Sequence, residues 1–166
     1  MRKVVFIIGF MLAAAMVDAQ TLRTVKITDV EKIIAESKTP LMINFWATWC
    51  KPCIEELPYF QQAVKDHNAT RGSADSIQLL LVSMDFKEDY PVGVKIFITK
   101  NNIQVPVFWL DETNADYFCP KVDTKWSGAI PATLFINHKT GYRNFVEEQI
   151  SPDELKKQIM AILKTN

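Results

Sequence analysis

Apolar runs and segments of helical periodicity follow one another along most of the chain. Three runs rich in aliphatic and aromatic residues have the length and composition of buried strands: residues 40–46, 77–85 and 105–110. Directly after the first run, Leu57, Phe60 and Val64 recur at the spacing of one helix face, which predicts a helix over residues 54–66. Strands that alternate with helices in this way predict an α/β domain.

The C-terminal part of the sequence predicts a hairpin and a closing helix. Residues 132–137 and 142–146 have strand composition and a glycine-containing turn lies between them, so the two strands should pair antiparallel. Ser151 then offers a capping hydroxyl and Pro152 fits the first helical position. Together with the apolar positions that follow, they predict a final helix that reaches Leu163.

The first residues have the layout of a secretory signal peptide. Arg2 and Lys3 precede an apolar run at 4–17, and the residues after this run favour cleavage between Ala19 and Gln20. An uncleaved membrane anchor is the alternative, but the run is shorter than the roughly 20 residues that span a bilayer. We therefore expect an exported protein, periplasmic or otherwise extracytoplasmic, without stable membrane insertion after cleavage.

Length and charge indicate one domain and exclude some partners. Residues 1–19 are assigned to the signal peptide, and residues 20–166 suit a single globular domain. The full sequence has 19 basic and 19 acidic residues, so it provides no basic field for nucleic acid. Partners must then be recognised by shape and local chemistry.

The three cysteines cannot all pair within one exported chain. Cys50 and Cys53 are separated by two residues, a spacing that suits reversible exchange, whereas a structural disulfide closing so small a loop would stabilise little. Half of a zinc site is a second alternative, but Cys119, His67 and His138 lack the paired spacing of zinc ligands. The spacing favours a redox pair and no metal.

The flanking residues suggest different roles for the two sulfurs. Cys50 lies between a predicted strand and a predicted helix, so it should sit at a helix N-terminus, where the helix dipole stabilises a thiolate. Lys51 adds a positive charge beside it, and Pro52 fits the first turn because its missing amide hydrogen would have no partner there. Cys50 is therefore the predicted nucleophile.

The segment from Phe45 to Cys53, Phe-Trp-Ala-Thr-Trp-Cys-Lys-Pro-Cys, resembles the active-site segment of thioredoxin-like proteins. The leader, Asn44 and the Glu-Leu-Pro triplet that starts at Glu56 resemble the exported TlpA/ResA-type thiol-disulfide oxidoreductases. This resemblance implies a thioredoxin-like fold, a central mixed β-sheet flanked by helices, with an inserted helix-strand element at about 90–110. It also implies no cofactor other than the Cys50–Cys53 disulfide.

The same resemblance assigns a substrate site. It implies a cis peptide before Pro131, with Pro131 facing the redox pair and the Ile130 backbone offered to an extended substrate segment. Trp49 is expected to contact substrate as well, and Trp46 and Trp49 to frame the site.

Glu56 is the predicted proton acceptor. Thioredoxins carry a buried aspartate six residues before the first cysteine, where this sequence has Asn44. At about 100° per residue, Glu56 falls at the border of the helix face that carries Cys53, whereas Glu55 points away. Burial would raise the pKa of Glu56 and fit it to exchange a proton with Cys53. A carboxylate on the helix surface is the alternative.

These residues predict a reductase of protein disulfides, in which Cys50 attacks the substrate and Cys53 resolves the mixed disulfide. The resemblance implies re-reduction by a membrane thiol-transfer protein, with cytochrome c maturation as one destination. Two alternatives to a reductase are a disulfide-forming oxidase and a protein-binding module with a structural disulfide.

The remaining conspicuous side chains have plainer interpretations. Trp109 and Trp126 are expected to pack in the core or at the surface, and His67 and His138 to be solvated. Cys119 is expected to be an inert, partly buried thiol, with an intermolecular disulfide or a regulatory role as the alternative.

Overall fold

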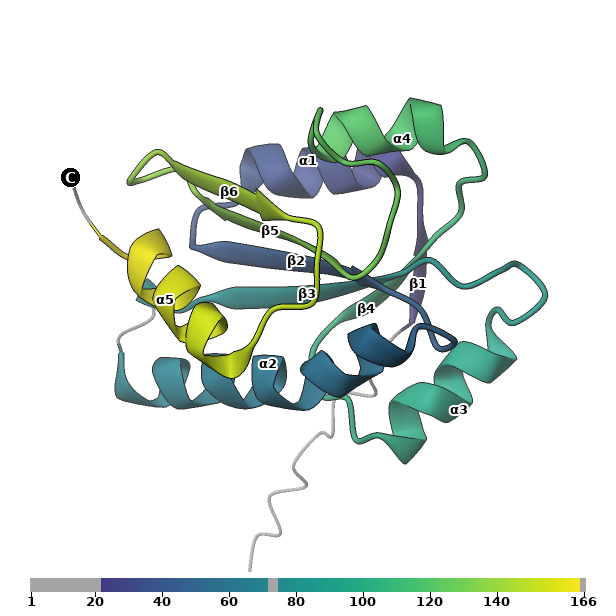
Figure 1. Ribbon diagram of the computed structural model, residues 1–166, viewed down its shortest axis with the longest axis horizontal. Coiled ribbons are helices and arrows are strands. Elements are labelled where there is room, and N and C mark those ends of the chain that lie inside the picture. The colour runs from purple at the N-terminus through teal and green to yellow at the C-terminus, as the bar shows by residue number, and fades with distance from the viewer. Residues whose placement is uncertain (1–21, 72–74, 165–166) are drawn as a thin grey trace, which may run out of the picture.

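The computed structural model describes residues 22–71 and 75–164; the expected signal peptide and its cleavage site lie outside this part of the chain (Figure 1). Its helices and strands alternate along most of the sequence. In chain order they are β1 (Arg23–Val25), α1 (Ile27–Glu36), β2 (Leu41–Trp46), α2 (Lys51–Thr70), β3 (Gln78–Ser83), α3 (Val92–Lys100), β4 (Val107–Leu110), α4 (Ala115–Val122), β5 (Ala132–Asn137), β6 (Tyr142–Val146) and α5 (Pro152–Ile162).

Within the described residues, the strands form one six-stranded sheet in the order β1-β4-β3-β2-β5-β6. The β1–β4, β4–β3 and β3–β2 pairs are parallel, whereas β5 pairs antiparallel with both β2 and β6. The predicted mixed sheet and the predicted C-terminal hairpin are therefore confirmed.

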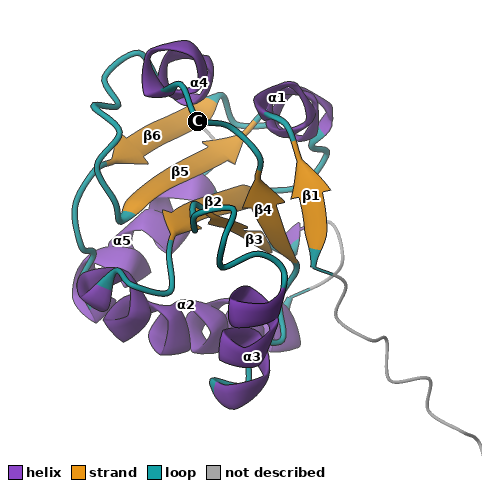
Figure 2. Ribbon diagram, turned by 90° about the vertical axis from the view of Figure 1, so that its right-hand side faces the viewer, coloured by secondary structure: helices purple, strands orange, loops and turns teal. Residues whose placement is uncertain are grey.

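Helices cover both faces of this sheet (Figure 2): α2, α3 and α5 lie on one face, and α1 and α4 on the other. The central strand β2 is buried at every position for this reason. Met42 and Trp46 pack toward α2, and Ile43 and Phe45 pack into the opposite apolar layer. Burial on both faces explains why the sequence of β2 is a continuous apolar run without alternating polar residues.

The range proposed for the inserted element, about 90–110, contains α3 and β4. Three further elements were not predicted: β1, α1 and α4. The buried residues of α1, namely Ile27, Val30 and Ile34, do recur at helical spacing. Its N-terminus lacks a capping serine or threonine, and the Asp29 carboxylate instead accepts a hydrogen bond from the Lys26 amide at 2.8 Å.

No helix within residues 22–71 and 75–164 is both long enough and apolar enough to cross a membrane.

Candidate active site

The redox pair lies where β2 ends and α2 begins. Cys50 is the N-cap residue of α2, and its sulfur accepts a hydrogen bond from the Cys53 amide at 3.3 Å. The two cysteines form a disulfide with Cα atoms 5.3 Å apart. Cys50 is 5% exposed and Cys53 is 0% exposed, so of the two residues only Cys50 reaches the surface. The Cys50 sulfur is also the one at the positive end of the helix dipole.

Asp85 fixes the short segment that leads into the redox pair. One of its carboxylate oxygens accepts hydrogen bonds from the Thr48 amide, at 2.9 Å, and from the Thr48 hydroxyl. The other oxygen accepts a bond from the Ser83 hydroxyl at 2.7 Å, and the Asp85 carbonyl accepts one from the Trp109 indole at 2.7 Å. Because Thr48 is two residues before Cys50, these bonds hold the segment that carries Cys50 in place. The sequence interpretation did not identify Asp85.

A cis peptide bond joins Ile130 to Pro131, as the sequence resemblance implied. The Ile130 carbonyl oxygen lies 3.8 Å from the Cys50 sulfur. A disulfide sulfur has no hydrogen to donate, so this is a van der Waals contact. The pairing of β5 with β2 ends at Ala132, which leaves the Ile130 backbone outside the ladder and beside the disulfide.

Glu56 is fully buried on α2, as predicted from its helix face. Its carboxylate accepts hydrogen bonds from the Asn44 amide group at 2.8 Å and from the Ile150 backbone amide at 3.1 Å. Burial raises its pKa to about 7, and the bonds from Ile150 and Asn44 offset only part of this effect. Glu56 is three residues after Cys53, the separation at which side chains on a helix are neighbours. The neighbouring Glu55, in contrast, is exposed.

Asn44 occupies the centre of the sheet beneath this site. Its amide nitrogen donates to Glu56 and also to the Thr133 hydroxyl, at 3.0 Å, whereas its amide oxygen is buried and has no partner among the described residues. Glu56, Asn44 and the Thr133 hydroxyl therefore form a buried polar cluster between the sheet and α2.

The two tryptophans near the redox pair have different environments. Trp49 is 54% exposed and its ring stacks on the exposed Phe86 ring, with centroids 5.7 Å apart. Trp46 is fully buried, and its ring centroid is 5.1 Å from that of Phe97. Trp49 thus lies at the surface next to Cys50, whereas Trp46 packs beneath the pair in the same apolar cluster.

Comparison with known families matches residues 10–141 to the model described as the AhpC/TSA family. The chain belongs to the AhpC/TSA family. It is similar to a thiol-disulfide oxidoreductase ResA from Oceanobacillus iheyensis, with 28% identity over 133 residues, which are 80% of this chain and 59% of that protein. The chain thus spans about three-fifths of the length of this curated relative.

Solved structures of similar proteins support a thioredoxin-like fold for this chain. A thioredoxin-related protein from Neisseria meningitidis serogroup B superposes with a TM-score of 0.62 and 19% identity, covering 78% of this chain and 89% of that one. StoA from Bacillus subtilis superposes with a TM-score of 0.54 and 25% identity, covering 75% and 85% respectively.

The other conspicuous residues are Cys119, two histidines and two tryptophans. Cys119 is buried, and burial raises the pKa of its thiol to about 11, so the thiol is protonated at neutral pH. Within the part of the chain that the structure describes, no group of three His, Cys, Asp or Glu residues could hold a metal ion. His138 is exposed and His67 is half-buried. Trp109 and Trp126 are both buried.

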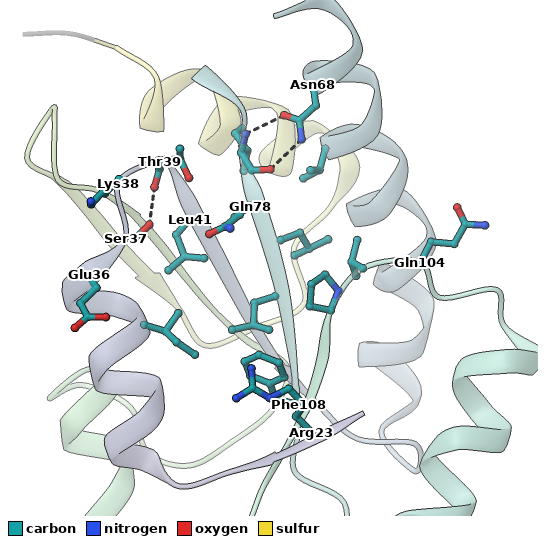
Figure 3. Close-up of a pocket in the computed structure, with 17 residues that line it drawn as sticks. Arg23, Glu36, Ser37, Lys38, Thr39, Leu41, Asn68, Gln78, Gln104 and Phe108 are labelled. Atoms are coloured by element: carbon teal, nitrogen blue, oxygen red, sulfur yellow. Dashed lines mark hydrogen bonds between the residues drawn. The ribbon is translucent and has the colours of Figure 1, made fainter. Parts of the chain in front are cut away.

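A cavity of about 690 Å³ lies at the opposite end of the sheet (Figure 3). Its wall includes Leu41 and Gln78, the first residues of β2 and β3, whereas the redox pair follows the last residue of β2. This cavity therefore does not belong to the site around Cys50.

Proposed function

We propose that the protein is an exported thiol-disulfide oxidoreductase that reduces disulfides in protein substrates. The observation that carries this proposal is the asymmetry of the disulfide. The Cys50 sulfur lies at the N-terminus of α2 beside the Ile130 carbonyl, whereas Cys53 is completely buried. One sulfur is thus placed to exchange with an external disulfide, and the other is placed to react only within the protein.

The reaction begins with the reduced protein. The Cys50 thiolate attacks one sulfur of the substrate disulfide, a mixed disulfide forms, and the other substrate sulfur leaves as a thiolate that takes a proton from solvent. Cys53 then gives its proton to Glu56 and attacks the Cys50 sulfur, and the second substrate sulfur leaves as a thiolate that also takes a proton from solvent. The substrate gains two electrons and two protons, and the protein is left with the Cys50–Cys53 disulfide.

Glu56 acts as the acceptor for the proton of Cys53 in this scheme. A pKa of about 7 lets the carboxyl take up and release a proton near neutral pH, where an ordinary glutamate would stay ionised. Its burial three residues after Cys53 supports proton transfer from that sulfur to the Glu56 carboxylate, directly or through one water.

The substrate is an extended protein segment next to a disulfide. The Ile130 backbone offers main-chain hydrogen bonds with little dependence on side chains, and Pro131 and Trp49 contact the same segment. Trp46, Lys51 and Pro52 shape the site around the pair. The Cys50–Cys53 disulfide serves as the redox group, without another cofactor.

Residues 1–19 act as the signal peptide in this proposal, and residues 20–166 as the exported domain. Each turnover oxidises the redox pair, so a second protein must reduce it again. For an extracytoplasmic protein, a membrane thiol-transfer protein is the suitable reductant. Cytochrome c maturation is a pathway that the two proteins would serve together.

The midpoint reduction potential of the Cys50–Cys53 couple tests the direction of electron flow. The protein would be equilibrated with mixtures of reduced and oxidised dithiothreitol, and the thiols counted after alkylation. A reductase should lie near the thioredoxin value of about −270 mV, whereas about −120 mV would make the protein an oxidase. Failure to accelerate insulin reduction by dithiothreitol would instead indicate a binding module.

A further inference from the structure

A carboxylate at the end of β6 accepts hydrogen bonds from the loop between α4 and β5. Glu147, the residue after β6, accepts hydrogen bonds from the Ser127 amide at 3.0 Å, from the Ala129 amide at 3.0 Å and from the Ser127 hydroxyl. These contacts lie one to three residues before Ile130, whose carbonyl oxygen is in contact with the Cys50 sulfur.

The same loop is held from its inner side by Trp126. The Trp126 indole donates a hydrogen bond to the Ala129 carbonyl at 2.9 Å. Its ring is buried, with centroids 4.5 Å from Phe45 and 5.8 Å from Phe145. Ala129 therefore has its carbonyl fixed to the core by Trp126 and its amide fixed by Glu147.

We propose that Glu147 is a positioning residue for substrate binding: it holds the segment Ser127–Ala129 so that the Ile130 backbone faces Cys50 in the orientation that an extended substrate requires. This role rests on the function proposed above, because it matters only if Ile130 binds substrate. Glu147 contacts neither redox sulfur, so it acts through the loop and takes no part in the exchange chemistry.

The charge of Glu147 suits this role. Partial burial opposes its ionisation, but the hydrogen bonds donated by Ser127 and Ala129 outweigh that effect and lower the pKa of Glu147 below its ordinary value. An ionised carboxylate accepts stronger hydrogen bonds from backbone amides than a neutral group does. Without these hydrogen bonds to Glu147, only a fraction of the protein molecules would hold the Ile130 backbone in the substrate-binding orientation. The apparent affinity for substrate would then fall in proportion to that fraction.

The test compares Glu147→Ala and Glu147→Gln with wild type in steady-state reduction of a protein disulfide. Glu147→Ala should raise KM about tenfold with little change in kcat, because a loosened loop weakens binding without altering the cysteines. Glu147→Gln should give a smaller increase, since the carboxamide oxygen can still accept from the Ser127 and Ala129 amides. The neighbouring, exposed Glu148 supplies the matched control, Glu148→Ala, which should behave as wild type.

Two further measurements separate positioning from general loss of structure. Hydroxyethyl disulfide has no peptide groups to pair with Ile130, so Glu147→Ala should reduce it at the wild-type rate. Amide hydrogen exchange at Ser127 and Ala129 should quicken in Glu147→Ala while exchange in β2 stays unchanged.

Two kinds of result would overturn the role. An unchanged KM in Glu147→Ala, or an equal loss with hydroxyethyl disulfide, would refute positioning by Glu147 while leaving the proposed function standing. A wild-type protein that reduces no protein disulfide would instead refute the proposed function, and the role of Glu147 with it.

Discussion

Replacing Glu56 with glutamine removes a carboxylate that the fold keeps out of water. Glutamine has nearly the same size, but it stays neutral at every pH and can offer only one oxygen to the two donors, Asn44 and Ile150. The lost acceptor lowers stability by an amount that does not depend on pH. The difference in unfolding free energy between variant and wild type should therefore change with pH only through the ionisation of Glu56.

The sign and size of this change follow from the pKa. The folded value of about 7 lies above the ordinary 4.5, so between these values the folded protein binds more protons than the unfolded chain. Wild-type stability then falls as the pH rises through this range and levels off above pH 7. Between pH 5 and pH 8, the contribution of Glu56 to the wild-type unfolding free energy falls by about 2.5 kcal/mol. Glu56→Gln should show no such fall, because its side chain does not ionise.

Denaturant unfolding of the oxidised proteins at pH 5 and pH 8 measures this difference. Glu56→Gln should gain about 2.5 kcal/mol relative to wild type between the two pH values. The matched control is Glu55→Gln, because Glu55 is exposed and its nearest cation, Lys51, is 3.9 Å away. The control should keep a constant difference from wild type. A constant difference for Glu56→Gln as well would refute the raised pKa.

Three further outcomes are expected. Glu56→Gln should slow thiol-disulfide exchange near neutral pH by about a hundredfold, measured by stopped flow, and a pH profile identical to that of wild type would exclude the proton-acceptor role. Asp85→Ala should lower the unfolding free energy by about 3 kcal/mol, because the buried Ser83 hydroxyl and the half-buried Thr48 amide lose their hydrogen-bond acceptor; a loss below about 1 kcal/mol would argue against this. Intact mass of extracytoplasmic protein should show Gln20 as the first residue, and a retained apolar leader would contradict cleavage there.

The elements that the sequence predicted correctly carry strong local signals. The apolar face of α2, the two strands of the hairpin and the cap of α5 each depend on residues close together in the chain. Ser151, for example, accepts a hydrogen bond from the Glu154 amide at 3.2 Å, as its position before Pro152 implied.

Two of the three elements that were missed, β1 and α4, have weak local signals. Strand β1 has three residues, too few to show a period, and α4 contains Pro120, a residue that usually argues against a helix interior. Both elements form because neighbours far along the chain support them: β1 pairs with β4, and α4 packs beside α1.

The site shows the same division. The redox pair, its place at a helix N-terminus and the burial of Glu56 could be predicted because they depend on residues close together in the chain, with support from the resemblance to thioredoxin-like proteins. Asp85 could not, since its bond to Thr48 spans 37 residues, and Glu147 reaches a loop 18 residues before it. Asp85 did leave one signal, because it is an acidic residue within the predicted buried run 77–85.

The trapping of mixed disulfides tests the division of roles between Cys50 and Cys53 most directly. Cys53→Ser keeps the attacking thiol and removes the resolving one, so it should accumulate disulfide-linked complexes with substrate proteins, seen on non-reducing gels and released by dithiothreitol. Cys50→Ser should accumulate none, because the remaining sulfur is buried. Equal trapping by the two variants would contradict the account.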